Sequence, residues 1–338
     1  MQKEKCSIEL YVNKKYLFPN NYLEEARSNT LLDENEYDIY FILLGDSYKI
    51  KGIYEDERLL HIIVVNITDN NKYLIDVDVL ESFRVPYCSC LEIKLADEGA
   101  ILNIEYNDKG IEYLKKYCPK EYYVYMDRIE KEGYFHVSMH AKFLVEMLME
   151  SNKQEHVEQY DILYIGQTKQ DDIFNRLNSH HTLQRIMRET YRSNSQKELY
   201  IIILSIATKH IETSILPDFN TYFYLSNTLA KGFELNALKK DAMINMAEAL
   251  FISYFQPKYN KRLKSREGRE KLNTYRKIDN AEINPIILTF DLFYEDTKKK
   301  LILKTDLETT RNKVLMIECA FKKDSLSVTC IDFPDAFY

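Results

Sequence analysis

The stretch from Asp161 to His180, DILYIGQTKQDDIFNRLNSH, determines how the rest of the chain is interpreted. Its first five residues predict a β-strand that stops at Gly166 and leads into a helix. This path carries a tyrosine, an arginine and a histidine, which are Tyr164, Arg176 and His180. Because Arg176 and His180 are four residues apart, they are expected on one face of that helix.

A second stretch, AEALFISYFQPKYN, contains Glu248 near its start and ends at Asn260. The pattern predicts a helix over Asn236–Phe255 that ends before Pro257. Glu248 is a lone carboxylate in an apolar part of this helix, where a buried charge costs several kcal/mol unless it is paired or binds a metal. Together the two stretches supply a phenol, a guanidinium, an imidazole, a carboxylate and an amide. This set is suited to cutting a phosphodiester.

The composition is that of a soluble globular protein, with 45% hydrophobic and 29% charged residues. With 338 residues the chain is long enough for two domains, or for one core with a large elaboration. The start, MQKEKCSIELYV, carries charges and no long apolar run, so no signal peptide is expected. No stretch approaches the roughly 20 apolar residues of a membrane span. We therefore expect a cytoplasmic protein with reduced cysteines and no membrane partner.

Charge is distributed unevenly along the chain. The whole sequence holds 46 Lys+Arg and 53 Asp+Glu, whereas residues 161–280 hold 19 and 13. The positive excess falls in the segment that carries the candidate chemistry, which is where a polyanion is expected to dock. A solvated basic face is the alternative explanation.

The regions on either side are predicted to be rich in β-strands. Between residues 37 and 106, short β-branched and aromatic runs alternate with turn clusters such as TDNN and NDKG, which predicts a mostly antiparallel β domain. Further strands are expected over Tyr122–Ile129 and Tyr134–Met139, and helices over Ala141–Glu150 and Ile173–Thr190. Strand-like runs return after residue 285.

The predicted fold class is therefore α+β, with a small antiparallel sheet flanked by helices in the middle of the chain. The expected division is a β-rich N-terminal domain over residues 1–120, a central domain over 121–278, and C-terminal strands over 279–338. These last strands can complete the N-terminal sheet, which would make the middle region an insertion.

The order of the runs LYIGQT, RLNSH and AEALFISYFQPKYNK resembles the GIY-YIG nuclease domain, over about a third of the chain. Tyr164-Ile165-Gly166 matches the YIG element. Arg176 and His180 fall on the following helix, where the family keeps an arginine and an accompanying histidine.

The later helix extends the resemblance. Glu248 falls where the family keeps its metal-binding carboxylate, and Asn260 follows in the P-K-Y-N context typical of many members. Three elements in the family's order are far more specific than a YIG triplet, which is how many strands end.

The family's first strand, GIY, has no clear match shortly before Tyr164. A literal Gly52-Ile53-Tyr54 lies 110 residues upstream and is interpreted as coincidence. The better candidate is Tyr134, with Tyr123 or Tyr125 behind it. This choice inserts a helix and a polar loop between the two paired strands.

The resemblance implies a role for each group. Glu248 would hold a single Mg²⁺ or Mn²⁺, and Arg176 would bind the phosphate oxygens. Tyr164, or its expected strand partner Tyr134, would activate or orient the attacking water. His180 would transfer a proton or hold the phenol, and Asn260 would orient the strand end.

The expected function is a divalent-metal-dependent endonuclease acting on DNA, with RNA left open and with restriction or antiphage defence as an analogy. The expected nucleic-acid contacts are basic residues at the start of the run KRLKSREGREKLNTYRK and just before it: Lys258, Lys261, Arg262, Lys264 and Arg266. The alternative is a catalytically inactive module that binds nucleic acid or protein, which the missing GIY strand favours.

Overall fold

The computed structural model describes residues 5–28, 36–56, 59–78, 88–96, 99–152, 155–168, 172–193, 196–213, 240–261, 283–295, 297–322 and 325–331. The chain forms two compact units. Unit 1 combines residues 1–45, 157–294 and 299–338, and unit 2 combines residues 46–156 and 295–298. Unit 2 is therefore an insertion within the sequence of unit 1.

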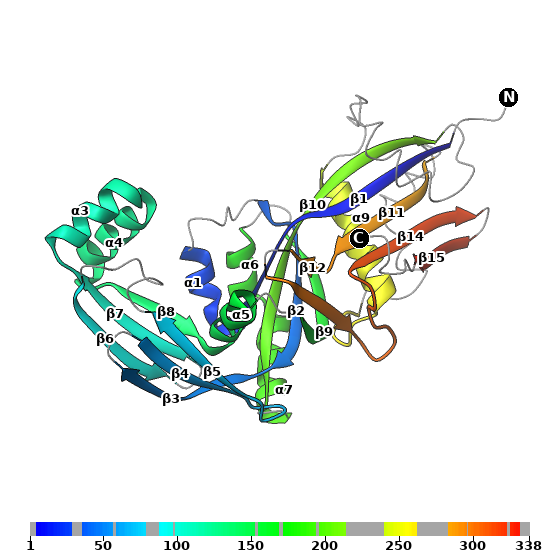
Figure 1. Ribbon diagram of the computed structural model, residues 1–338. Helices are drawn as coiled ribbons and strands as arrows, with labels where there is room; N and C mark the ends of the chain where they lie inside the picture. Colours follow the sequence, from blue (N-terminus) through cyan, green and yellow to red (C-terminus); the bar gives the residue numbers. More distant parts are fainter. Residues whose placement is uncertain are drawn as a thin grey trace. The chain divides into compact units, whose positions relative to one another are not determined.

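Unit 1 is built on one large curled sheet, in which nine strands of the described residues follow the order β12-β13-β9-β2-β10-β1-β11-β14-β15 (Figure 1). Strand β1 pairs antiparallel with β10 and parallel with β11, and β2 pairs antiparallel with β9. The strands are β1 (Lys5–Pro19), β2 (Ile39–Asp46), β9 (His156–Gln167), β10 (Lys197–Thr213), β11 (Ile283–Asp291), β12 (Phe293–Tyr294), β13 (Lys299–Lys304), β14 (Val314–Lys322) and β15 (Ser325–Ile331).

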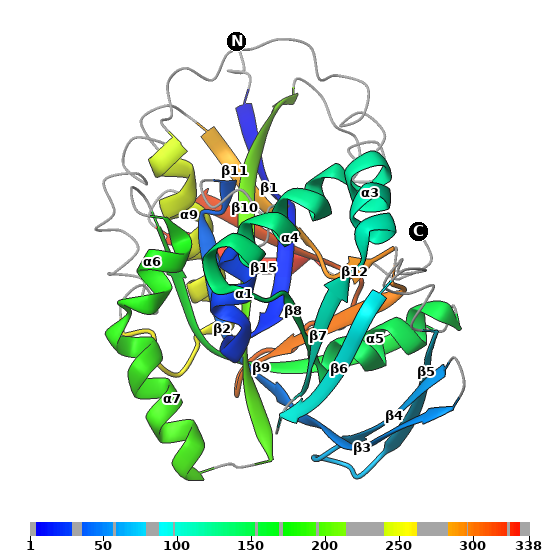
Figure 2. The ribbon, with the colours of Figure 1, turned by 90° about the vertical axis from the view of Figure 1, so that its left-hand side faces the viewer.

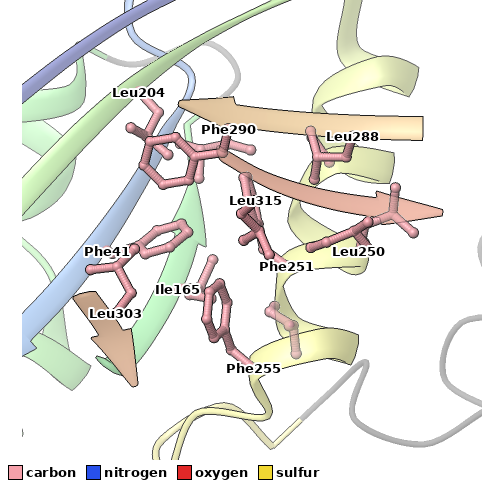
Figure 3. Close-up of a cluster of buried hydrophobic side chains, with 14 of the residues drawn as sticks. Phe41, Ile165, Leu204, Leu250, Phe251, Phe255, Leu288, Phe290, Leu303 and Leu315 are labelled. Atoms are coloured by element: carbon pink, nitrogen blue, oxygen red, sulfur yellow. The ribbon is translucent and has the colours of Figure 1, made fainter. Parts of the chain in front are cut away.

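Helix α9 (Lys240–Phe255) packs on one face of this sheet because it is apolar nearly all round. Phe251 of α9 meets Phe41 of β2 and Phe290 of β11 edge to face, with ring centroids 5.0 and 5.9 Å apart. Figure 3 shows these rings together with the leucines that surround them. Aromatic pairs in this arrangement add about 0.5–1.5 kcal/mol each beyond the burial of apolar area.

Short helices cover the other face of the sheet. They are α1 (Leu23–Ser28), preceded by a 3₁₀ turn at Asn20–Tyr22, α6 (Ile173–Asn178) and α7 (His181–Ser193). Figure 2 shows α6 and α7 following one another beside the sheet. Tyr40 alternates with Phe41 along β2 and therefore faces away from α9. On that side Phe174 of α6 lies against Phe18 of β1, with a centroid distance of 6.3 Å.

Unit 2 contains two three-stranded sheets, in the orders β3-β4-β5 and β6-β7-β8. Its core joins apolar side chains of both sheets to helix α5, with Ile62, Ile104 and Leu144 among the buried members. The elements are β3 (Tyr48–Asp56), β4 (Leu59–Asn66), β5 (Lys72–Asp78), β6 (Cys88–Ala96), β7 (Gly99–Tyr106), α3 (Asp108–Tyr117), α4 (Pro119–Glu132), β8 (His136–His140) and α5 (Ala141–Ser151).

Two expectations for individual elements are wrong. Residues 122–129 form part of helix α4 and not a strand, since Pro119 starts the helix and Gly133, with φ of 78°, ends it in the left-handed conformation. The helix expected over 173–190 is divided into α6 and α7 by a break at Ser179 and His180. The other expected strands and helices that fall on described residues are present.

The division into units also differs from the expected one. The C-terminal strands β11 and β13–β15 join the sheet that contains β9 and β10, rather than the strands of residues 48–106. The inserted segment is therefore residues 46–156, and the middle of the chain belongs to the main sheet. Pairing between strands distant in sequence creates this arrangement, and local patterns do not encode it.

The structure is mixed α+β, in agreement with the expected fold class. Among the described helices, we find none with the length and apolar character needed to cross a bilayer.

Candidate functional site

The candidate site is centred on two tyrosines on neighbouring strands. In the β2–β9 pair, Tyr40 lies opposite Gly166 and Ile42 lies opposite Tyr164. The tyrosine rings have centroids 6.2 Å apart. Gly166 makes this approach possible, because a Cβ atom there would lie 2.5 Å from the Tyr40 hydroxyl and 2.8 Å from Tyr164 Cε1. The glycine of the YIG triplet is thus required by space and not by backbone conformation.

Asp38 fixes the start of the strand that carries Tyr40. Its Oδ2 accepts a hydrogen bond from the Ile206 amide at 3.0 Å, and its Oδ1 lies 2.9 Å from Nζ of Lys240. The backbone of Asp38 also donates to Leu204 and accepts from Thr168. Asp38 therefore connects β2, β10, the end of β9 and the first turn of α9 at the edge of the site.

His180 enters the site from the break between α6 and α7. Its ring lies 5.7 Å from the Tyr40 ring in an edge-to-face arrangement and 5.1 Å from the Tyr164 ring. Nδ1 of His180 accepts a hydrogen bond from the Leu183 amide at 3.2 Å, so the side chain caps α7. With Nδ1 as the acceptor, the neutral ring carries its proton on Nε2, which is a donor.

The charge state of His180 follows from its surroundings. Burial, with the positive charge of Arg176 and the neighbouring His181 as smaller causes, lowers the pKa of His180 to about 4. The imidazole is therefore neutral at pH 7. Of the two expected roles, this favours holding a phenol over accepting a proton.

Arg176 lies on α6 with an exposed side chain. Its positive charge contributes to the pKa shifts of Tyr40, Tyr164 and His180, lowering the pKa of each. Among the described residues, the buried Tyr40 hydroxyl has no hydrogen-bond partner of good geometry. The positive charge of Arg176 partly opposes the rise in the pKa of Tyr40.

Both phenols resist ionisation. Burial raises the pKa of Tyr40 well above its ordinary value, and the charge of Tyr164 adds to this effect. Burial also raises the pKa of Tyr164, and the Glu248 carboxylate raises it further, while Arg176 and Tyr40 act in the opposite direction. Both side chains are protonated at neutral pH. They can therefore donate and accept hydrogen bonds but do not act as ready bases.

Glu248 projects from α9, and Gln167 at the end of β9 holds it. Nε2 of Gln167 donates to Oε2 of Glu248 at 2.7 Å and to Oδ1 of Asn245 at 2.9 Å. Because Gln167 directly follows the YIG triplet, the hydrogen bond to Glu248 brings the carboxylate to the end of β9 that carries Tyr164. The charge of Glu248 also helps to raise the pKa of both tyrosines. Oε1 of Gln167 is buried and has no hydrogen-bond partner among the described residues.

Asn260 has a structural role at the site. Its Oδ1 accepts from the Ile165 amide at 2.9 Å, and its Nδ2 donates to the Ile165 carbonyl at 2.7 Å. The buried amide thus imitates one residue of a neighbouring strand beside the YIG triplet. This agrees with the expectation that Asn260 orients the strand end.

The expected pairing of Tyr134 with the Tyr164 strand is wrong. Tyr134 lies between α4 and β8 in unit 2, its side chain is 54% exposed, and β8 pairs with β7. The tyrosine opposite the YIG triplet is Tyr40. The sequence Asp38-Ile39-Tyr40 differs from GIY in its first residue only, which is the signal that could have identified it.

Gln167 is the second residue that the sequence interpretation missed, although it directly follows the YIG triplet. Of the expected nucleic-acid contacts, Lys258 and Lys261 are exposed on the loop after α9. Arg262, Lys264 and Arg266 lie outside the described residues.

A divalent cation fits this site only if it binds through few protein oxygens. Among the residues that the structure describes, no group of three or more His, Cys, Asp or Glu side chains is placed to enclose a metal. The candidate ligand oxygens are those of the Glu248 carboxylate and Oε1 of Gln167, which is buried and has no hydrogen-bond partner among the described residues. This suits Mg²⁺, which binds through one or two protein oxygens and keeps most of its water.

The chain matches no family model, no curated protein and no solved structure.

Proposed function

We propose that the protein is a divalent-metal-dependent endonuclease of the GIY-YIG type that hydrolyses phosphodiester bonds in DNA. The observation that supports this is the convergence of Tyr40, Tyr164, Arg176, His180 and Glu248, which come from β2, β9, α6, the α6–α7 break and α9. These side chains span more than 200 positions in the sequence, and the fold gathers them at one end of a strand pair.

Each residue has a role that its environment allows. The exposed Arg176 presents a planar, permanently charged fork to the phosphate oxygens and to the charge that develops on them. The protonated phenol of the partly exposed Tyr164 orients the attacking water by hydrogen bonds, and the buried Tyr40 packs beside it. His180, with its proton on Nε2, holds a phenol or a phosphate oxygen in place.

Glu248, with Gln167 beside it, would hold the metal ion, which supplies Lewis-acid polarisation of the phosphate when bound. Gln167 keeps the carboxylate in one orientation by donating from Nε2. Asn260 keeps Ile165, and hence Tyr164, in register with β2.

The competing proposal, an inactive binding module, was favoured by the lack of a first tyrosine. Tyr40 supplies that tyrosine, buried and beside Tyr164. The observation that favoured the alternative is therefore removed.

The test is cleavage of supercoiled plasmid by the purified protein with Mg²⁺ or Mn²⁺. Glu248→Gln and Arg176→Ala should each lower the cleavage rate about a hundredfold or more, since each removes a group that stabilises the transition state. Glu308→Gln and Arg311→Ala, two exposed residues on unit 1 outside the site, are the matched controls and should cut as the wild type does. Cleavage that survives in both site variants would remove the proposal.

A further inference from the structure

Helix α7 carries a line of arginines that begins beside the candidate site. At 100° per residue Arg185, Arg188 and Arg192 fall on one stripe, opposite the buried Leu183, Ile186 and Thr190. Arg188 and Arg192 are exposed. The helix starts directly after His180, so the stripe runs away from the site along the helix axis.

The loop after α9 extends this positive surface. The Tyr259 hydroxyl donates to the Glu189 carboxylate of α7, and Cζ of Arg185 lies 5.1 Å from the Tyr259 ring centroid. Nζ of Lys258 lies 5.3 Å from the same ring centroid. Tyr259 therefore joins the loop to α7 and brings Lys258 beside the arginine stripe.

The acidic group on α7 is already engaged. Glu189 is the single carboxylate of the helix, and it accepts from Tyr259 and lies 3.9 Å from Nε of Arg185. In the described part of the chain no carboxylate pairs with Arg188, Arg192 or Lys258. An ordinary solvated helix carries both basic and acidic side chains on its exposed face. Helix α4 is an example, since Nζ of Lys131 lies 2.8 Å from Oδ1 of Asp127. The stripe on α7 differs because, among the described residues, Arg188 and Arg192 have no carboxylate partner, on a chain with 46 basic and 53 acidic residues.

The geometry points to α7 as a binding track for the phosphates of duplex DNA, with Arg188, Arg192 and Lys258 as its contacts. This rests on the proposed function for the nature of the polyanion. The stripe from residue 185 to residue 192 is about 10 Å long, and over that distance one strand of a duplex presents about three phosphates. Arginine forks bind phosphate oxygens in pairs, which suits a regularly spaced row. A single strand would need free aromatic rings for stacking, and the Tyr259 ring is already flanked by Arg185 and Lys258.

The test measures how tightly the protein binds a fluorescein-labelled duplex of about 24 base pairs and arbitrary sequence. Binding is monitored by fluorescence anisotropy without metal, in EDTA, over a range of KCl concentrations. The protein is the full chain carrying Glu248→Gln, so binding is measured without cleavage. Arg188→Gln with Arg192→Gln should weaken binding about tenfold at moderate salt and reduce the slope of log K against log salt by about 2, because two phosphate contacts are lost. Both side chains are exposed, so the thermal midpoint should stay within a few degrees of the parent.

The matched control is Lys109→Gln with Lys115→Gln on α3, which also removes two exposed positive charges. The inference is overturned if the arginine pair leaves the slope unchanged, or if the α3 pair reduces it equally. Tighter binding of a single strand of the same length would overturn the choice of duplex. The measurement is independent of plasmid cutting, so a failure of the proposed nuclease activity and a failure of the α7 track give different results.

Discussion

At the scale of single residues, the candidate site depends on residues that fix the positions of neighbouring groups. Gly166 keeps space free for two phenols, and Asn260 occupies the backbone hydrogen bonds of Ile165. His180 uses one ring nitrogen to cap a helix, which leaves the other as a defined donor. None of these three residues needs to take part in a reaction, but each helps to hold the two tyrosines in place.

The first residue-scale prediction concerns Gly166→Ala. The added methyl would lie 2.5 Å from Tyr40, a ring that is fully buried, so both tyrosines must move. We expect a loss of about 1–3 kcal/mol in the free energy of unfolding, as for other overpacked cores. A displacement of about 1 Å in the site should reduce cleavage about a hundredfold.

Urea denaturation and plasmid cutting measure the two effects. Gly52→Ala is the control, because its nearest contact would be Ile63 Cδ1 at 3.8 Å. Wild-type stability in Gly166→Ala would show that the tyrosines do not occupy the described positions.

The second residue-scale prediction concerns pH. His180 has a pKa of about 4 in the folded protein, mainly through burial, against an ordinary 6.5. Well above pH 6.5 the imidazole is almost entirely unprotonated in both the folded and the unfolded state, so it has little effect on stability. As the pH falls from 6.5 towards 4 the unfolded chain takes up the proton first, and the folded state loses stability.

His180→Asn keeps a capping side chain but cannot titrate in this range. The fall in unfolding free energy between pH 7 and pH 4.5 should therefore be smaller in the variant than in the wild type, as measured by urea titrations at both pH values. Equal falls would mean that His180 is exposed to water or charged in the folded state.

At the scale of elements, the site is assembled where a strand end meets a helix. Gln167 closes β9 and bonds Asn245 and Glu248, which are three apart on α9 and so lie on one helix face. At the C-terminal end of α9, Thr305 Oγ1 donates to the Phe255 carbonyl at 2.7 Å. The helix is thus held near its middle and at its C-terminal end while its apolar surface packs on the sheet.

The element-scale prediction is that Gln167→Leu weakens metal binding without removing the ligand. A residue that orients a metal ligand typically accounts for about 10–100-fold in metal affinity. The dissociation constant for Mn²⁺, measured by electron paramagnetic resonance of the free ion, should therefore rise about tenfold or more. Gln184→Leu on α7, also a glutamine, is the control and should bind as the wild type does. An unchanged Mn²⁺ affinity in Gln167→Leu would assign Gln167 a purely structural role.

At the scale of the whole molecule, a 111-residue segment separates the two tyrosine strands in the sequence without entering their core. The buried residues around α9 all come from unit 1. Leu44 of β2 pairs with Asp161 of β9, close to the two points where the inserted segment begins and ends. Unit 1 therefore has its own core and its own closed strand pair.

The prediction at this scale is that unit 1 folds without the insertion. Residues 46–156 are replaced by Asn-Gly between Gly45 and Val157, a turn that suits a β-hairpin. We expect one cooperative thermal transition and a circular dichroism spectrum with both strand and helix signals. A non-cooperative or aggregated product would show that unit 2 supplies stability that unit 1 lacks.

Several residues of the candidate site could be named from the sequence, whereas the pairing of distant strands could not. Tyr164, Arg176, His180 and Glu248 were predicted because each lies in a short local pattern. Tyr40 was missed because 111 inserted residues separate its strand, β2, from the partner strand β9. Local sequence does not show that two strands so far apart pair with each other. The strand expected over 122–129 failed because tyrosines and valine favour strands, whereas Pro119 and Gly133 mark a helix's ends.

The central position of β1 has a consequence for the order in which the protein is made. This first strand pairs with β10 and, in parallel, with β11, so it must wait for residues synthesised long after it. Folds dominated by such distant pairings form slowly, in roughly milliseconds to seconds, and parallel neighbours cannot form from a simple hairpin. The side chains of the candidate site lie before residue 261, but the sheet that aligns them also includes β11, β13 and β14, which follow in the sequence. During synthesis the site would therefore be aligned only after these later strands have joined the sheet.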